Sequence, residues 1–289
     1  MMAERTLGVI GGSGLYELPG LEATEQTRVR TPFGDPSDDV VVGRLGNTRL
    51  LFLPRHGRGH RLLPSELPFR ANIWALKSLG ADCLLAVSAV GSLREEIAPG
   101  HVVIPDQFID RTRGRQSEST FFGRGVVAHV QFADPFCAPL SSALAAAARA
   151  AGATAHVGGT YVCIEGPAFS TRAESNLYRS WGAHVIGMTN LQEAKLAREA
   201  ELCFATLALA TDYDCWHTGH DDVQIEAVLA VLAANVTLAR RTVAALVERL
   251  PEPTGCSCAR ALENAIITDR AAIPAQVKRD LAPIAGRYL

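Results

Sequence analysis

The sequence has no long hydrophobic run and no block of like charges. Its longest apolar stretches, such as Ala143–Ala148 with their flanks, are too short to span a bilayer. The first residues lead directly into a strand-like segment, without the long apolar core of a signal peptide. A net charge of −2 argues against a dedicated nucleic-acid surface or a polybasic membrane surface. We therefore expect a cytoplasmic protein that binds neither nucleic acid nor membranes.

Several catalytic motifs are also absent. The sequence has no dinucleotide fingerprint, no Walker loop and no Gly-x-Ser-x-Gly elbow. The absence of the serine elbow gives little support to a covalent hydrolase. We expect a site without a metal and without a redox cofactor.

Cysteine is present in an odd number, seven. Most of the cysteines, among them Cys83, Cys163 and Cys203, lie in strand-like segments and are expected to be buried reduced thiols. The pair Cys256 and Cys258 is different, because a Cys-x-Cys pair can bind a metal or form a strained disulfide. Structural zinc normally has four ligands, and no second Cys/His pair lies near this one in the sequence. We therefore expect no metal here and leave the redox state of the pair open.

Short apolar runs alternate with helical periodicities along the 289 residues. This alternation predicts a single α/β domain over residues 1–289, with a central mixed sheet flanked by helices and a C-terminal helical extension from about residue 255. Pro251–Ser257 is the only plausible hinge. The expected strands are Leu7–Ile10, Val40–Arg44, Thr48–Pro54, Cys83–Val90, His101–Ile104, Thr160–Ile164, His184–Met188 and Leu202–Ala210. The expected helices are Pro68–Leu79, Leu140–Ala151, Arg172–Trp181, Asn190–Ala200, Asp221–Leu250 and a last one near Arg260–Thr268, before a polar tail.

The segment T-L-A-L-A-T-D-Y-D at 206–214 is the most informative one. It predicts a buried strand that ends in two carboxylates, Asp212 and Asp214, and strand ends are where α/β enzymes commonly place their chemistry. The two acids are two residues apart, so on an extended backbone both would point the same way. They would then face one heteroaromatic ligand together.

Other predicted strands also end in residues suited to a ligand. Gly11–Gly14 and the pair Arg55-His56 suit an anion, because glycine lets the backbone approach it and arginine offers a planar fork. Ser88–Ser92 closes a buried strand with small residues, and Thr189 follows a strand where a helix begins. Each feature also has a purely structural interpretation, as a tight turn or a solvated basic loop.

Together these segments resemble the trimeric purine nucleoside phosphorylase family over nearly the whole chain. The matching segments include V-I-G-G-S-G-L (9–15), T-P-F-G-D-P-S-D (31–38), R-H-G (55–57), A-N-I-W-A-L-K (71–77), G-S-L-R-E-E-I (91–97), D-Q-F-I-D-R-T (106–112), I-E-G-P-A-F-S-T-R-A-E-S (164–175) and A-T-D-Y-D-C-W (210–216). The resemblance implies an enzyme of methionine and purine salvage that cleaves 5′-methylthioadenosine with phosphate to adenine and 5-methylthioribose 1-phosphate. It also implies that no cofactor is needed, since phosphate is a substrate, and that the chain forms a homotrimer.

The resemblance assigns roles to individual residues. The implied phosphate-binding residues are Ser13, Arg55, His56, Ser88 and Thr189. The implied nucleoside-binding residues are Ala89, Phe169, Met188, Asp212, Asp214, Ile225, Val228 and His129, the last from a neighbouring subunit. Asp214 would be the general acid at purine N7, and Asp212 would read the 6-amino group. Ser170 and Ile225 are expected to influence specificity.

The chain also departs from the family pattern. Many members have threonine at Ser13 and asparagine at Gly187, and the helix start Asn190-Leu191-Gln192-Glu193 is unusual. These differences leave the 5′ substituent open, and phosphorolysis of 5′-haloadenosines, adenosine or methylthioinosine remains an alternative. A nucleoside hydrolase or a non-catalytic purine-binding protein is the alternative of a different class.

Overall fold

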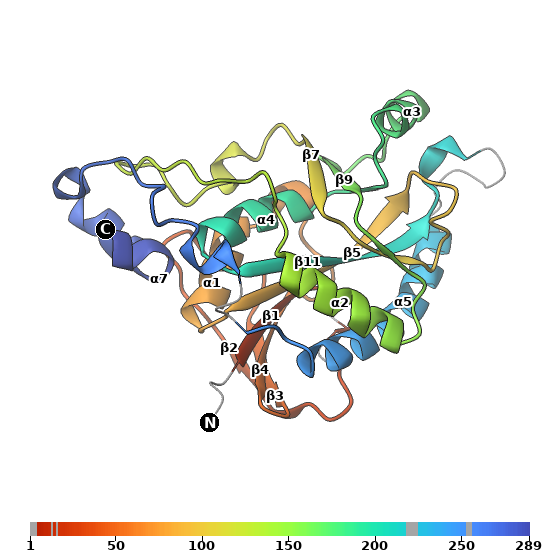
Figure 1. The fold of residues 1–289 in the computed structure, drawn as a ribbon, viewed down its shortest axis with the longest axis horizontal. Coiled ribbons are helices and arrows are strands. Elements are labelled where there is room, and N and C mark those ends of the chain that lie inside the picture. Colours follow the sequence, from red (N-terminus) through yellow and green to blue (C-terminus); the bar gives the residue numbers. More distant parts are fainter. Residues whose placement is uncertain (1–4, 13, 16, 218–224, 253–255) are drawn as a thin grey trace.

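The predicted strands assemble into one mixed sheet in the computed structural model, which describes residues 5–12, 14–15, 17–217, 225–252 and 256–289 (Figure 1). Within these residues the sheet has eleven strands, in the order β2-β3-β4-β1-β5-β10-β9-β7, with β11 paired to β5 and β6, and β8 paired to β6. The strands are β1 (Arg5–Gly11), β2 (Glu22–Thr27), β3 (Val40–Leu45), β4 (Thr48–Pro54), β5 (Cys83–Ser92), β6 (Val102–Ile104), β7 (Gln107–Arg111), β8 (Ala155–Val157), β9 (Thr160–Ile164), β10 (Val185–Gly187) and β11 (Cys203–Asp212).

Strand β5 lies at the centre of the sheet. It runs parallel to β1 on one side and parallel to β11 on the other, and its last residues pair antiparallel with β10. Successive side chains of a strand point to opposite faces. Leu84 and Ala86 accordingly pack into one hydrophobic core, and Leu85 and Val87 into another. Both faces are buried, which explains why the strand reads as a continuous apolar run.

Helices cover both faces of the sheet (Figure 1). One core contains side chains from α1, α4, α6 and α7, and the other contains side chains from α2 and α5. The helices are α1 (Phe69–Ser78), α2 (Ala138–Ala150), α3 (Arg172–Ser180), α4 (Asn190–Glu199), α5 (Ile225–Val247), α6 (Ala275–Asp280) and α7 (Ala282–Ala285). None of the described helices is long and apolar enough to cross a membrane.

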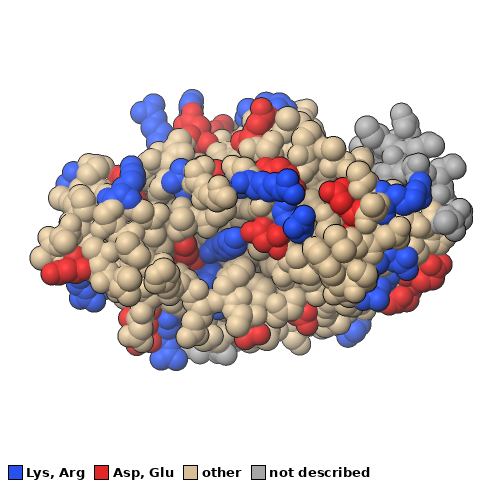
Figure 2. All heavy atoms as spheres, turned by 90° about the horizontal axis from the view of Figure 1, so that it is seen from above, with Lys and Arg blue, Asp and Glu red and all other residues tan. Residues whose placement is uncertain are grey.

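Charged side chains are mixed on the surface. Figure 2 shows that basic and acidic residues are interspersed on the face that it presents, and neither sign forms a continuous patch there. This distribution agrees with the small net charge of the sequence.

The structure confirms the fold class predicted from the sequence. The hairpin between β3 and β4 turns at Gly46, whose positive φ of 57° suits glycine. The predicted start of the long helix at Asp221 lies outside the described residues.

The predicted helix near Arg260–Thr268 is wrong. A short 3₁₀ helix, η5 (Ser257–Arg260), is followed by turns, and Ile266 forms a β-bridge with Ala128. The amide of Ile267 also donates to the carbonyl of Val127. Pairing with a distant segment thus replaces the local helix. The C-terminal helices α6 and α7 lie further along the chain, in the segment expected to be a polar tail.

Strands β2, β7 and β8 were not predicted. The first has the sequence E-A-T-E-Q-T and lies at the edge of the sheet, where only one neighbour is available. Such an edge strand needs no alternating apolar residues, so the pattern gave no signal.

Candidate active site

A cavity of about 400 Å³ lies where several strands end. Residues in or directly after β1, β4, β5, β9, β10 and β11 line it, together with Val236 and Ala239 of α5. Ten of the predicted site residues lie in its wall: Arg55, His56, Ser88, Ala89, Phe169, Ser170, Met188, Thr189, Asp212 and Asp214. The fold therefore brings these strand ends together.

Only the first of the two acids is on the extended backbone expected for both, because β11 ends at Asp212. The pairing register of β11 with β5 shifts between Ala210 and Asp212, so that Asp212 lies opposite Gly91. Asp214 then begins a 3₁₀ helix, η3 (Asp214–Trp216), with a positive φ of 50°. Both acids still line the cavity, Asp212 from the strand and Asp214 from the turn that follows it. A left-handed conformation at a non-glycine residue is costly and often marks a functional position.

The two carboxylates have different hydrogen-bond partners. Asp212 Oδ2 accepts from the Thr211 hydroxyl at 2.7 Å, and Asp212 Oδ1 accepts from the Asp214 amide at 2.8 Å. Asp214 Oδ2 is buried and accepts no hydrogen bond from the described residues. Asp214 Oδ2 is therefore free to form a hydrogen bond with a ligand, whereas each oxygen of Asp212 already accepts a hydrogen bond from the protein.

Burial raises the pKa of both acids. The neighbouring Asp212 carboxylate raises the pKa of Asp214 further, while Ser175 and the amide of Cys215 lower it. For Asp212 the bonds from Thr211 and from the Asp214 amide oppose the effect of burial. A carboxyl group shifted in this way holds its proton closer to neutral pH than a solvated one.

The 3₁₀ helix that carries Asp214 is anchored by Trp216. The indole Nε1 donates to the carbonyl of Ser92 at 2.7 Å, and the Arg179 guanidinium lies 3.6 Å from the ring centroid. The helix is thereby fixed to the end of β5 and to α3.

Arg55, also in the cavity wall, forms a buried ion pair. Its Nε and Nη2 donate to the two carboxylate oxygens of Glu193 at 2.6 and 3.0 Å, and its Nη1 donates to the carbonyl of Val87 at 2.7 Å. Both side chains of the pair are less than 5% exposed. The guanidinium is therefore held rigidly, and Glu193 offsets its charge. Sequence reasoning did not assign a role to Glu193, although it noted the unusual helix start.

The hydrogen-bond network continues from Glu193 to Ser88. The side-chain amide of Asn190 donates to Glu193 at 3.1 Å, and Asn190 Oδ1 accepts from the Ser88 hydroxyl at 2.7 Å. Thr189, which precedes α4, is also buried in the cavity wall. The unusual helix start thus connects two predicted phosphate-binding residues, Arg55 and Ser88.

His56 is held in one tautomer. Its Nδ1 lies 2.8 Å from the carbonyl of Leu62, which can only accept, so Nδ1 carries a proton. Burial lowers the pKa of His56 to about 4, and the nearby Arg55 contributes to the decrease. The ring is neutral at pH 7, so its Nε2 is a hydrogen-bond acceptor.

Gly187 is required by close packing. A Cβ atom at this position would lie 1.9 Å from the Tyr161 hydroxyl. Tyr161 is fully buried, and its hydroxyl makes no hydrogen bond with the described residues. Tyr161 therefore occupies the space that the side chain of an asparagine at position 187 would need.

Arg115 connects two loops of the cavity wall. This buried residue donates to the backbone carbonyls of Met188 and Glu165, and its Nε lies 3.2 Å from the Glu165 carboxylate. Gly166 packs so closely on Met188 that a Cβ would lie 2.5 Å from the sulfur. Neither Arg115 nor Tyr161 was predicted as a site residue, because each acts through contacts distant in the sequence.

Phe169 lies on the open side of the cavity. The side chain is 51% exposed although it lines the cavity, and Ser170 follows it in the wall. An exposed aromatic ring at a cavity wall is available to pack on a planar ligand.

Four predicted residues are not placed in the cavity by this chain. Ser13 and the side chains of Ile225 and Val228 lie outside the described residues. His129 is exposed, away from the residues that line the cavity.

Comparisons with known proteins identify the class. The family model described as "Phosphorylase superfamily" matches residues 6–248, and the chain belongs to this family. A curated relative named S-methyl-5′-thioadenosine phosphorylase, from Geobacter sulfurreducens, is 61% identical over 99% of this chain and 100% of its own length. The protein of the same name from Koribacter versatilis is 56% identical over 100% and 97%.

Solved structures give the same result. A methylthioadenosine phosphorylase from an Antarctic soil metagenomic library matches with a TM-score of 0.91 and 46% identity, over 98% of this chain and 99% of that one. A methylthioadenosine phosphorylase from Schistosoma mansoni, in complex with adenine, matches with a TM-score of 0.78 and 38% identity, over 84% and 91%. The resemblance to the phosphorylase family and the predicted enzyme class are thereby confirmed.

Proposed function

We propose that this chain cleaves 5′-methylthioadenosine with inorganic phosphate, giving adenine and 5-methylthioribose 1-phosphate. One observation carries the proposal: a single cavity is lined by two carboxyl groups, one buried and one half-buried, and by an arginine, a histidine and two hydroxyl side chains. High identity to relatives named for this reaction supports the same substrate.

The carboxyl groups suit the departing purine. A purine anion is a poor leaving group, so protonation at N7 lowers the barrier. Asp214 is the proposed donor, because its Oδ2 has no partner among the described residues and burial raises its pKa. Asp212 is the proposed reader of the 6-amino group, because its oxygens are held as acceptors by Thr211 and the Asp214 amide.

The arginine, the histidine and the two hydroxyl side chains of the wall suit phosphate. Arg55 contributes a fixed guanidinium, and Thr189 and Ser88 contribute hydroxyl groups. The Ser88 hydroxyl would exchange its bond with Asn190 for one with phosphate. Neutral His56 would accept a hydrogen bond at Nε2 from the P–O–H group of hydrogen phosphate, since Nδ1 already donates to Leu62.

The ribose would lie between the purine-binding and the phosphate-binding parts of the wall. Met188 would lie under the sugar, held by Arg115 and by Gly166, while the backbone of Ala89 and the ring of Phe169 would contact the nucleoside. Phosphate attack on C1′ would then occur as the C1′–N9 bond breaks and positive charge develops on the ribosyl group. Fixed groups around such a charge stabilise it without reorganisation.

The assembly and location belong to the same proposal. We infer a homotrimer in the cytoplasm, in which Ser13, Ile225 and Val228 complete the site and His129 reaches it from a neighbouring subunit. The exposure of His129 in the single chain agrees with that role.

Phosphate dependence tests the reaction. Purified protein with 5′-methylthioadenosine should release adenine only when phosphate is added, and the sugar product should carry phosphate at C1. Equal release of adenine without phosphate would indicate a nucleoside hydrolase, and binding without turnover would indicate a non-catalytic protein.

A substrate panel tests the 5′ substituent. One Schistosoma mansoni relative is described as an adenosine/methylthioadenosine phosphorylase, so adenosine is a real alternative. We expect kcat/KM to be highest for 5′-methylthioadenosine when it is compared with adenosine, methylthioinosine and a 5′-haloadenosine. A higher kcat/KM for any of the other three would replace the proposed substrate while leaving the phosphorylase reaction intact.

A further inference from the structure

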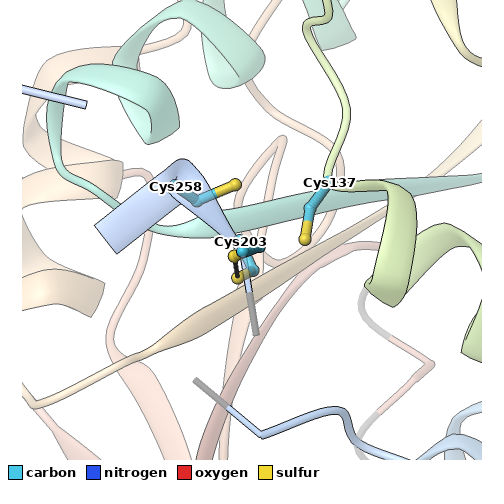
Figure 3. A group of neighbouring side chains, drawn as sticks. Cys137, Cys203 and Cys258 are labelled. Atoms are coloured by element: carbon cyan, nitrogen blue, oxygen red, sulfur yellow. Dashed lines mark hydrogen bonds between the residues drawn. The ribbon is translucent and has the colours of Figure 1, made fainter. Parts of the chain in front are cut away.

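Four of the seven cysteines meet in one place that the active site does not use. The Sγ atoms of Cys137, Cys203, Cys256 and Cys258 all lie within 4.8 Å of one another. None of the four lines the cavity. Figure 3 shows three of them, Cys137, Cys203 and Cys258, extending into the same space.

The thiols come from three separate segments of the chain. Cys137 precedes α2, Cys203 is the first residue of β11, and Cys256 and Cys258 flank the start of η5. In the sequence only Cys256 and Cys258 are neighbours, which is why no metal was expected there. The fold supplies the second pair from positions more than 50 residues away in the sequence.

We propose that these four cysteines form a closed tetrathiolate site for a thiophilic divalent ion, with Zn²⁺ as the favoured ion. The site would be structural, because all four positions of a tetrahedral ion would be filled by protein. It is separate from the phosphorolysis reaction and does not depend on the proposed substrate.

The spacing of the sulfur atoms suits such an ion. Zn–S bonds of about 2.3 Å in a tetrahedron place the sulfur atoms about 3.8 Å apart. The observed separations, up to 4.8 Å overall and 3.2 Å between Cys203 and Cys256, lie on both sides of that value. Small side-chain movements would therefore make the four sulfur atoms equidistant from one ion.

The surroundings favour an ion over free thiolates. Three of the four side chains are buried and the fourth, Cys256, is partly buried. Each ligating thiol would give its proton to water as the ion binds, so that the ion supplies the positive charge that holds the thiolates.

The site would fasten the C-terminal segment to the sheet. Glu201, two residues before Cys203, already accepts from the amide of Leu262, the guanidinium of Arg287 and the hydroxyl of Tyr288. An ion bound by Cys203 and the Cys256/Cys258 pair would add a further connection at the same point. The expected consequence is a higher melting temperature for the ion-bound chain.

Cobalt binding by the full-length chain tests the proposal. The protein is reduced, freed of metal with a chelator and titrated with Co²⁺ alone. We expect about one Co²⁺ per chain, with sulfur-to-cobalt charge-transfer absorption and the visible bands of a tetrahedral site, and loss of both when Zn²⁺ is added. The melting temperature should rise with Zn²⁺ and return on chelation.

Single variants assign the ligands. Cys256→Ser and Cys258→Ser should each weaken Co²⁺ binding at least about tenfold, and Cys163→Ala, which removes a buried thiol outside the cluster, should not. Retained phosphorolysis shows that a variant is folded. The proposal is overturned if reduced wild-type protein binds no more Co²⁺ than Cys258→Ser. It is equally overturned if the four thiols pair as disulfides and the reduced chain takes up no ion.

Discussion

Two neighbouring aspartates illustrate how residues of one type acquire different roles. Asp212 remains on the strand and accepts two hydrogen bonds, while Asp214 lies in a left-handed turn with one oxygen unpartnered among the described residues. The sequence predicted that both would face the ligand and which would donate the proton. It could not predict the turn, because the register shift opposite Gly91 depends on pairing with β5.

Replacement of Asp214 tests the proposed proton donor. Asp214→Ala should lower kcat for 5′-methylthioadenosine by roughly 10²–10⁴-fold, the usual range for loss of a general acid. Asp214→Asn should gain activity toward 6-oxopurine nucleosides relative to 6-aminopurine nucleosides, because a side-chain amide cannot give a proton to N7 but can donate a hydrogen bond to N7 or to a 6-oxo group. Steady-state kinetics with both substrate types measure this. A wild-type kcat in the alanine variant would exclude the role, and Asp110→Asn on the surface is the control.

Gly187 provides a second prediction at this scale. Gly187→Ala should destabilise the fold by about 1–3 kcal/mol, since its Cβ would overlap the Tyr161 hydroxyl and overpacking costs this much. Tyr161→Phe in the same chain should recover part of the loss. Urea unfolding of the two single variants and the double variant measures the coupling. Gly286→Ala, whose Cβ would meet only Ala282 at 3.8 Å, should leave stability unchanged. Additive effects of the two substitutions would contradict the proposed overlap.

At the level of elements, most strands and helices of the core could be predicted, because hydrophobic runs and helical periodicity are local signals. The structure places β9 at Thr160–Ile164 as predicted, and α4 within one residue. The failures share a cause. The C-terminal helix was replaced by pairing of Ile266 with Ala128, and β2 lacks alternation because it lies at an edge. Contacts such as Arg55 with Glu193, 138 residues apart, leave no local pattern.

Helix α4 carries a titratable group with a consequence for stability. Glu199 is buried at its end and accepts from the Thr120 hydroxyl and the Phe121 amide, each at 2.7 Å. Burial raises the pKa of Glu199 from 4.5 to about 7. Below pH 4.5 both folded and unfolded chains hold the proton. As the pH rises to 7, the unfolded chain loses its proton first, so the folded state is progressively destabilised by up to about 3 kcal/mol.

Glu199→Gln removes this titration. We expect the variant to be more stable than the wild type above pH 7 and similar to it near pH 4.5, because glutamine is neutral throughout. Urea denaturation at pH 5 and pH 8 measures the difference. Glu263→Gln, at an exposed position, is the matched control and should follow the wild type. Equal pH dependence in Glu199→Gln and wild type would contradict the assignment.

At the level of the whole molecule, the cavity wall contains residues from both halves of the chain, and one proposed residue, His129, is outside it. The family and its reaction could be predicted from sequence because long motifs match. The cysteine cluster could not, since three segments must fold before four thiols meet.

Mixing of inactive variants tests the shared site. His129→Ala and Asp214→Ala should each be impaired as pure proteins. After subunit exchange at equal amounts, about one quarter of the sites should combine an intact Asp214 with a neighbour's intact His129. Activity of the mixture is measured against each pure variant, and sedimentation velocity gives the oligomeric state. No recovery despite complete exchange would place His129 outside the neighbouring site.

The anchoring of η3 by Trp216 has a practical consequence. The chain has three tryptophans. The Trp216 indole lies two residues from Asp214 and donates to Ser92 at the end of β5, whereas the Trp74 indole donates to the carbonyl of Asp280 in the C-terminal segment. Intrinsic fluorescence can thus follow two distant events in unlabelled protein. Purine entry would alter the emission of one ring, and loosening of the C-terminal segment would alter that of the other.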